Sequence, residues 1–237
     1  MDVKELFEKD RYDLSDLRLV FSCLRGENGC PWDRVQTHES IRSNLIEETY
    51  EVVEAIDKAD LKLMREELGD LLLQVVFHAG IEEENGSFTL DDVISDVTDK
   101  LLRRHPHVFG TVEADDPEGA LNAWEAAKGE EKTERKTVVD KMNAVPPSLP
   151  ALMRAQKVNK KATKGGFDNG NLIASSAEEV IALGELMKKN EIGADEVKKH
   201  LGRALYGISA YAEKCELDSE FELTKECENF IKTYKET

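Results

Sequence analysis

Apolar residues recur at helical spacing along nearly the whole chain, and no segment alternates convincingly as a strand. Leu14, Leu17, Val20, Phe21 and Leu24, for example, follow the spacing of one face of an amphipathic helix. The same period predicts further helices from Glu39 to Ile56, from Leu61 to Glu84, from Thr89 to the stop signal HPHVFG, and from Ala120 to Thr133. The chain is therefore expected to be all-α.

Several residues that favour helix ends mark the boundaries of these segments. Thr89 followed by Asp92 resembles a capping box, and the glycine of ENGS ends the preceding helix. Asp116 before Pro117 has the form of an N-cap with proline at the first helical position. In DKAD, Asp60 is a candidate N-cap, which would turn two helices antiparallel at this point.

The chain is expected to consist of two parts joined by a linker. The best linker candidate is KTVVDKMNAVPPSLP, residues 136–150, which separates a segment 1–135 from a segment 151–237. The second segment repeats features of the first, because EELGDLLLQVVFHA (66–79) and KHLGRALYGISAYA (199–212) share a Leu-Gly pair and the apolar spacing that follows it. Two copies of one helical unit are therefore predicted.

Residues 47–70 contain six glutamates and three aspartates among apolar residues. On a helix, Glu48 and Glu51 lie about 60° apart, as do Glu67 and Asp70, so each pair shares a face. One straight helix would hold Glu51 and Glu67 about 24 Å apart. A turn at DKAD would instead fold the two helices together and bring the carboxylate pairs face to face.

Two interpretations of this acidic stretch remain open. Acidic runs are commonly solvated helix faces. Here, however, apolar residues lie on or beside the same stripes, which directs some carboxylates into an interhelical cleft. Carboxylates that face one another repel unless a cation compensates, and ligands that are all oxygen favour Mg²⁺, with Mn²⁺ as a substitute. A ferritin-like di-iron site would need Glu-x-x-His, which the chain lacks.

A group of basic residues follows the acidic stretch, in the segment DKLLRRHPH. Lys100, Arg103 and Arg104 are related by three and four positions and project from one side of the predicted helix. Arginine suits bidentate contact with phosphate, and lysine acts as a point charge. The alternative is a surface cluster that pairs with the excess acid of the chain. Together with the carboxylates, these residues favour a phosphorylated substrate.

The overall charge narrows the classes of partner. With 49 acidic and 32 basic residues the formal net charge is −17, which argues against unspecific binding to nucleic acid or to an anionic membrane. No stretch approaches 18 consecutive apolar residues, and the N-terminus lacks a secretory signal. The protein is therefore expected to act in the cytoplasm, on metals and small molecules.

Three segments together resemble the MazG family of nucleoside triphosphate pyrophosphohydrolases, within the all-α NTP pyrophosphatase superfamily. They are GCPWDRVQTHESIRSNLIEETYEVVEAID, REELGDLLLQVVFHA and DKLLRRHPHVFG. The family pattern of acids falls on Glu47, Glu48, Glu51, Glu67 and Asp70. The resemblance implies that Lys100, Arg103 and Arg104 contact phosphates, and that Trp124, Glu125 and Lys128 belong to the site. It extends from near the N-terminus to about residue 168.

This resemblance also implies a mechanism. Mg²⁺ would be held by Glu48, Glu51, Glu67 and Asp70, with Glu47 as a candidate base for the water that attacks the α-phosphorus of a nucleoside triphosphate. The products would be a nucleoside monophosphate and pyrophosphate, and a second chain is expected to complete the pocket in a homodimer. Trp32 is a candidate substrate contact that stacks on the base, or alternatively an apolar anchor against the first helix.

The second copy departs from the family pattern. His200 and Arg203 replace Glu67 and Asp70, and Ala182 stands where the third glutamate of EEVIA is expected. The predicted architecture is thus two MazG-like antiparallel helical bundles in tandem, the first (1–135) catalytic and the second (151–237) degenerate. Two alternatives stay open: a non-catalytic nucleotide or metal sensor that acts through protein partners, and a relative restricted to one nucleotide such as dUTP or dCTP.

Overall fold

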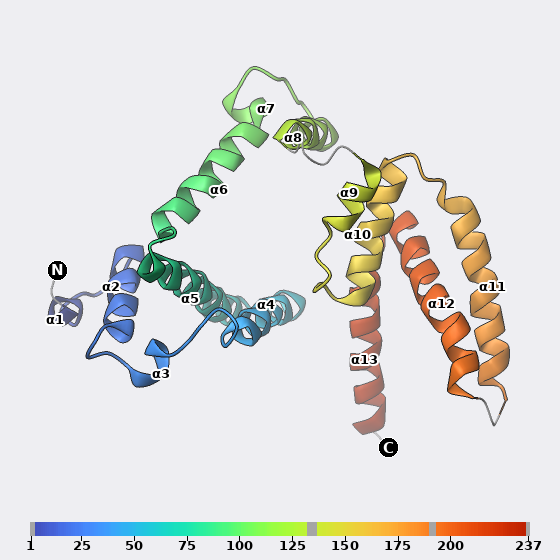
Figure 1. Cartoon of the computed structure of the whole chain (residues 1–237), viewed down its shortest axis with the longest axis horizontal. Coiled ribbons are helices and arrows are strands. Elements are labelled where there is room, and N and C mark those ends of the chain that lie inside the picture. Colours follow the sequence, from blue (N-terminus) through green and yellow to red (C-terminus); the bar gives the residue numbers. More distant parts are fainter. Residues whose placement is uncertain (1–2, 132–136, 190–192, 236–237) are drawn as a thin grey trace. The chain divides into compact units, whose positions relative to one another are not determined.

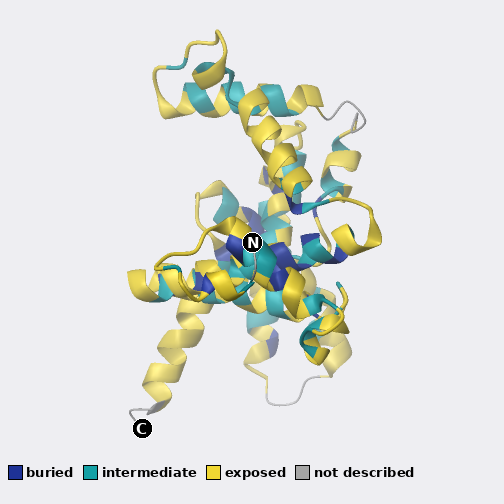
Figure 2. Ribbon diagram, turned by 90° about the vertical axis from the view of Figure 1, so that its left-hand side faces the viewer, coloured by how far each residue is buried: buried dark blue, intermediate teal, exposed yellow. Residues whose placement is uncertain are grey.

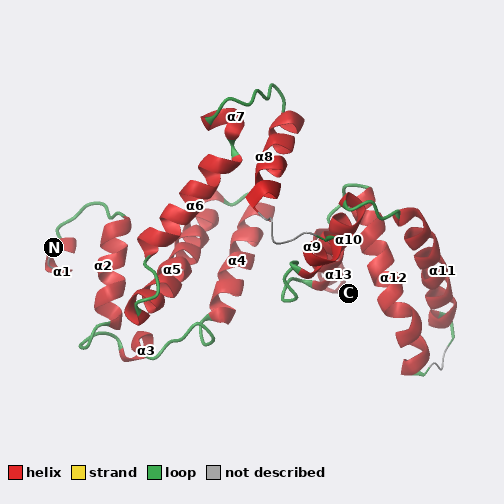
Figure 3. Cartoon of the chain, turned by 45° about the horizontal axis from the view of Figure 1, so that its top comes forward, coloured by secondary structure: helices red, strands yellow, loops and turns green. Residues whose placement is uncertain are grey.

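The computed structural model describes residues 3–131, 137–189 and 193–235, and in these ranges every regular element is a helix (Figure 1, Figure 3). The all-α prediction is confirmed. The chain divides into two compact units, Met1–Lys128 and Gly129–Thr237. None of the described helices combines the length and the apolar character needed to cross a membrane.

The first unit is organised around one long helix, α5. Its elements are α1 (Val3–Leu6), α2 (Leu14–Arg25), α3 (Pro31–Arg34), α4 (Arg42–Asp57), α5 (Leu61–Asn85), α6 (Leu90–Arg104), α7 (Pro106–Phe109) and α8 (Pro117–Glu131), the last of which runs across the boundary between the units. Helices α2, α4 and α6 all pack on α5. The short connection between α4 and α5 makes these two helices an antiparallel hairpin (Figure 1).

The boundaries of α5 and α6 lie within one residue of those that the sequence predicts. The Asp60 side chain caps α5 by accepting hydrogen bonds from the backbone N–H groups of Lys62 and Leu63, each at 3.0 Å. Gly86 ends the helix in the left-handed conformation, with φ of 72°. Thr89 and Asp92 form the predicted capping box at the start of α6. These signals act within a few residues, which is why the sequence alone locates them.

The start of α4 differs from the prediction, whereas α8 begins at the predicted N-cap and proline, three residues before Ala120. Helix α4 begins at Arg42 and not at Glu39, because Thr37 and Ser40 form reciprocal hydrogen bonds between side chain and backbone that hold a turn before it. Helix α8 begins at Pro117, and the carboxylate of Asp116 accepts a hydrogen bond from the N–H of Gly119, as an N-cap does. Its predicted end at Thr133 lies outside the described residues.

The core of the first unit lies where α2 meets α5. Its buried members are Phe21, Ile41, Val76, Phe77, Ala79, Ile81 and Leu90. The rings of Phe21 and Phe77 meet edge to face, with centroids 4.8 Å apart. A Cβ atom at Gly80 would lie 2.0 Å from the Phe21 ring, so this glycine permits the close approach of the two helices. In Figure 2, which colours the ribbon by burial, buried positions are few and most of the ribbon is exposed or intermediate.

The second unit contains α9 (Val138–Asn143), α10 (Ala151–Lys164), α11 (Asn169–Met187), α12 (Ala194–Lys214) and α13 (Ser219–Lys235). Helix α9 falls within residues 136–150, which the sequence predicts as a linker. It starts with a capping box of Thr137 and Asp140 and packs on α10. The part of this segment from residue 137 onwards therefore belongs to the second unit, and residue 136 lies outside the described residues.

The same order of packing appears in both units. In the first, α2, α4 and α6 pack on α5, and in the second, α10, α11 and α13 pack on α12. Aligning the two Leu-Gly pairs makes α5 the counterpart of α12, and α4 then corresponds to α11. The division into a catalytic segment and a degenerate repeat stays a prediction, which this correspondence supports.

Candidate metal and phosphate site

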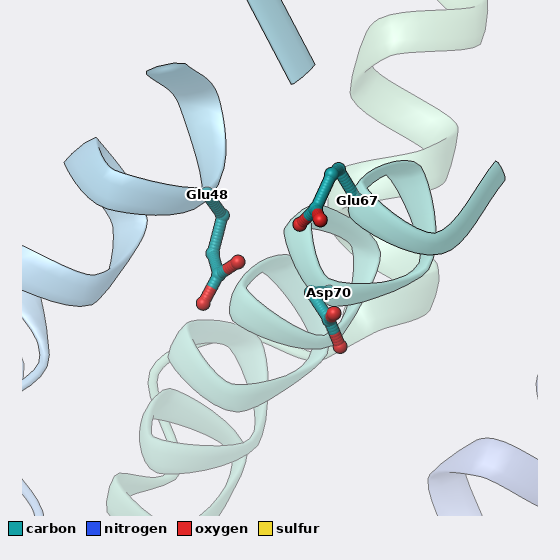
Figure 4. A group of neighbouring side chains, drawn as sticks. All are labelled: Glu48, Glu67 and Asp70. Atoms are coloured by element: carbon teal, nitrogen blue, oxygen red, sulfur yellow. The ribbon is translucent and has the colours of Figure 1, made fainter. Parts of the chain in front are cut away.

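Three carboxylates converge between α4 and α5. Glu48 on α4 points towards Glu67 and Asp70 on α5 (Figure 4), and one oxygen of each lies within 4.8 Å of the others. The hairpin turn capped by Asp60 creates this arrangement, because it sets the two acidic faces opposite each other. Such a set of oxygen atoms has the spacing and the chemistry of ligands for a hard divalent cation.

The electrostatics of this cluster are unfavourable without a cation. Burial raises the pKa of Glu48, and the charges of Asp70 and Glu51 raise it further. Burial likewise raises the pKa of Glu67, which is 9% exposed, and the charges of Glu51 and Asp70 act in the same direction. Glu51 therefore lies close enough to act on both, although it is outside the trio with the tightest spacing. A bound cation would reverse these effects.

Of the remaining predicted site residues, one lies beside the carboxylates and three lie together on α6 and α8. Glu47 is exposed on α4, next to Glu48. Arg104 and Lys128 both lie over the ring of Trp124, with the guanidinium carbon 5.7 Å and the ammonium nitrogen 4.1 Å from its centroid. Helices α6 and α8 thus bring together one arginine, one lysine and one tryptophan from the predicted set.

The other four candidates are on the surface, and one of them is Glu125, which is exposed on α8. Lys100 is exposed on α6, and Arg103 forms an ion pair with Asp99 at 3.0 Å. Trp32, in the short helix α3, is 59% exposed. Helix α3 packs on α2, so both interpretations of Trp32, a substrate contact and an apolar anchor against the first helix, stay predictions.

The second unit has a different cluster at the corresponding position. Glu179 on α11 accepts a hydrogen bond from Nδ1 of His200 at 2.5 Å and from Arg203 at 3.1 Å, both on α12. Both hydrogen bonds lower the pKa of Glu179, and the hydrogen bond with His200 has the larger effect. The residues that replace Glu67 and Asp70 in the sequence therefore hydrogen-bond to a glutamate, and Arg203 places a positive charge where the first unit has the negative charge of Asp70.

The sequence gives no indication of one polar cluster that the structure reveals. His38, before α4, lies 2.7 Å from His78 on α5 through their Nδ1 atoms, and its Nε2 atom lies 2.7 Å from Glu82. The spacing of His78 and Glu82, four residues apart, places them on one face of α5. No pattern connects them with His38, which is 40 residues away in the chain.

Comparison with known proteins identifies the family of this chain. A family model described as the MazG nucleotide pyrophosphohydrolase domain matches residues 36–109. The chain is 39% identical to the nucleoside triphosphate pyrophosphohydrolase/pyrophosphatase MazG of Thermotoga maritima, over 93% of this chain and 83% of that protein. It is 38% identical to the nucleoside triphosphate pyrophosphohydrolase of Escherichia coli strain K12, over 89% of this chain and 81% of that protein. The nucleoside triphosphate pyrophosphohydrolase of Mycobacterium tuberculosis is 46% identical, over 58% of this chain and 41% of that protein.

Proposed function

The chain belongs to the MazG family, and from this membership we propose that it hydrolyses nucleoside triphosphates to a nucleoside monophosphate and pyrophosphate at the carboxylate cluster between α4 and α5. The observation that carries the proposal is the approach of Glu48, Glu67 and Asp70 to within 4.8 Å. The matched family region, residues 36–109, contains this cluster together with the basic segment of α6.

The residues present suit Mg²⁺, with Mn²⁺ as a substitute. The donor set consists of carboxylate oxygens from Glu48, Glu67 and Asp70, and Glu51 adds a fourth negative charge nearby. Burial raises the pKa of Glu48 and Glu67, so the folded protein without metal resists full ionisation of the cluster. When bound, a divalent ion supplies positive charge that offsets the charge of a triphosphate.

The protein's own groups have separate parts in the proposed reaction. Glu48, Glu51, Glu67 and Asp70 hold the cation. Glu47, exposed beside Glu48, accepts the proton of the water that attacks the α-phosphorus. The bond between this phosphorus and the bridging oxygen breaks, and the electron pair leaves with pyrophosphate. Breaking the α–β bond and not the terminal bond follows from membership of the family.

Basic residues then act on the phosphates. We assign this part to Lys100, Arg103, Arg104 and Lys128, whose charges offset the negative charge on the departing pyrophosphate. The contacts of Arg104 and Lys128 with Trp124 restrict both side chains before substrate arrives. Trp32, largely exposed, is the proposed contact for the nucleoside.

The functional assembly is proposed to be a homodimer in the cytoplasm. Helices α4 and α5 expose apolar residues at helical spacing, namely Ile46, Tyr50 and Val53 on α4 and Leu68, Leu72 and Val75 on α5. These residues share their helices with the carboxylates, so a second copy packed on them would also enclose the site. Light scattering of the purified protein measures the assembly, and Leu72→Glu is expected to shift it towards the monomer.

A product assay tests the function directly. A panel of NTPs and dNTPs is incubated with the protein, with and without Mg²⁺, and the products are separated. Monophosphate and pyrophosphate that form only with metal support the proposal. Diphosphate and inorganic phosphate would contradict the assignment of the bond. Nucleotide binding without turnover would contradict the enzyme and favour a nucleotide sensor.

A further inference from the structure

Three side chains outside the carboxylate site form a continuous polar chain between α5 and the segment that leads into α4. Nδ1 of His38 lies 2.7 Å from Nδ1 of His78, and Nε2 of His38 lies 2.7 Å from a carboxylate oxygen of Glu82. His78 and Glu82 are one turn apart on α5. Asn85 donates a further hydrogen bond to Glu82 at 3.2 Å, which fixes the outer end of the chain.

The two imidazole rings share a hydrogen bond in one plane. Their planes are parallel to within 4° and their centroids are 5.0 Å apart. Stacked rings would keep their atoms at van der Waals separation, about 3.5–4.0 Å. The Nδ1 atoms are only 2.7 Å apart, so the rings lie edge to edge and the line between the two nitrogens runs nearly in both ring planes.

This geometry holds one proton between the two histidines. Glu82, when ionised, only accepts, so Nε2–H of His38 donates to it. One of the two Nδ1 atoms then carries the shared proton and the other accepts it. A second proton on this pair would set two N–H groups against each other, which the 2.7 Å separation does not allow.

The groups around the histidine pair act on its protonation in opposite directions. Burial lowers the pKa of His78, and the charge of His38 lowers it further. The carboxylate that faces His38 from α5 is Glu82, whose pKa the hydrogen bond with His38 lowers most. Glu39, beside His38 in the chain, adds a second negative charge. From α2, Arg25 approaches the same segment, but it donates to backbone carbonyls and to Glu84.

The cluster lies at the open end of the α4–α5 hairpin. At the other end the capped turn at Asp60 joins the helices covalently. At the end near His38, side-chain contacts hold the start of α4 to α5, among them those of the buried Ile41, which is 2% exposed. Glu48 lies between these two attachments, ten residues after His38. On α5, His78 is about 12 Å along the axis from Asp70.

We propose that His38, His78 and Glu82 form a latch that shares one proton and positions the start of α4 on α5, and so sets the separation of Glu48 from Glu67 and Asp70. The three are positioning residues and make no contact with substrate. The consequence for turnover rests on the proposed function, whereas the latch itself and its effect on metal affinity do not. A second proton on the facing Nδ1 atoms opens the latch, so acid weakens metal binding through this pair as well as through the carboxylates.

The test uses the full chain without nucleotide. The ¹⁵N shifts of the imidazole nitrogens are followed from pH 8 to pH 5, and Mg²⁺ affinity is measured by calorimetry across the same range. The expected result is a coupled titration of His38 and His78, with a fall in Mg²⁺ affinity as the pair takes its second proton. Independent titrations with ordinary pKa values would overturn the latch.

Variants separate positioning from simple stability. His78→Phe keeps a ring but removes the shared proton, and it is expected to weaken Mg²⁺ binding about tenfold and to abolish the step in its pH dependence. His78→Asn, whose amide N–H replaces Nδ1–H, should restore most of that affinity. His107→Phe is the matched control and should leave the affinity unchanged. If His78→Phe and the wild-type protein bind Mg²⁺ alike at every pH, the proposal is wrong.

Because these readouts are metal affinity and histidine shifts, an inactive but metal-binding wild-type protein would contradict the proposed function and leave the latch standing. Glu82→Gln adds a second check. It keeps the acceptor oxygen and removes the charge that favours protonated His38, so the midpoint of latch opening should move to lower pH. A midpoint that stays in place would contradict the role of Glu82.

Discussion

The hairpins α4–α5 and α11–α12 correspond in position but place opposite partners around a glutamate. Glu48 meets Glu67 and Asp70, and its pKa is raised. Glu179 meets His200 and Arg203, and its pKa is lowered. In the second hairpin the glutamate is hydrogen-bonded by its neighbours, whereas in the first hairpin the carboxylates repel one another. Because α11 and α12 pack together without such repulsion, the fold does not require it. Unfavourable charge that is present in only one of two similar hairpins supports the proposal that the functional site lies between α4 and α5.

The largest expected effect comes from replacing one side chain at the matching position of each cluster. Glu67→Gln should reduce kcat/KM by roughly 10²–10³-fold and abolish the rise in Tm on adding Mg²⁺, because a ligand is lost from the metal site. The matched variant His200→Gln should leave both quantities unchanged. Steady-state kinetics and thermal melts check the pair. Equal losses in the two variants would mean that both hairpins serve the reaction.

A second experiment converts one hairpin into the other. The triple variant Ala182→Glu, His200→Glu and Arg203→Asp gives α11–α12 the acids of α4–α5, with Glu179 already in place. It is expected to bind more Mn²⁺ per chain than the wild-type protein, as counted by electron paramagnetic resonance. Circular dichroism confirms that the helices persist. An unchanged count in a folded variant would show that α11–α12 lacks the geometry as well as the charges.

The two glutamates should also respond to pH with opposite sign. The pKa of Glu67 is raised above 4.5 in the folded protein, so without metal its ionisation destabilises the fold at neutral pH. Glu67→Gln should therefore melt at a higher temperature than wild type in EDTA. This gap should close as pH falls through the raised pKa towards 4.5.

Glu179 provides the opposite case. Its pKa is lowered below 4.5, so its ionised form stabilises the fold above that pH, and the contribution is lost as pH falls through the lowered pKa. Glu179→Gln should melt at a lower temperature than wild type at neutral pH and should approach it in acid. Thermal melts from pH 3.5 to 7.5 measure both differences. Shifts of one sign for both variants would contradict the comparison.

The smallest expected effect concerns the glycine that the hairpins share. A Cβ atom at Gly69 or at Gly202 meets nothing within 4 Å, and both residues lie inside long helices. Replacement by alanine should raise the free energy of unfolding by about 0.5–1 kcal/mol at either position, through helix propensity. Urea unfolding measures this change. A loss of activity confined to Gly69→Ala would instead place that glycine against substrate or a second chain.

The sequence alone determined much of this protein. Helical period and caps located α5 and α6, because the groups that end a helix lie within a few residues of it. The same local rules predicted that a turn at Asp60 would bring Glu48 opposite Glu67 and Asp70. The start of α4 was less accessible, since the Thr37–Ser40 turn competes with the helical period there.

Tertiary structure decided what no local pattern encodes. The helix at Val138 has a local start signal in the capping box of Thr137 and Asp140, but its packing on α10, which assigns the segment to the second unit, is not visible in its linker-like composition. His38 and His78 are 40 residues apart in the sequence, and they come within hydrogen-bonding distance only because the segment before α4 packs on α5. Arg104 and Lys128 meet on Trp124 for the same reason. Short-range hydrogen bonds depend on neighbouring residues and can therefore be predicted from the sequence. Contacts between side chains that are distant in the sequence form only when the helices pack.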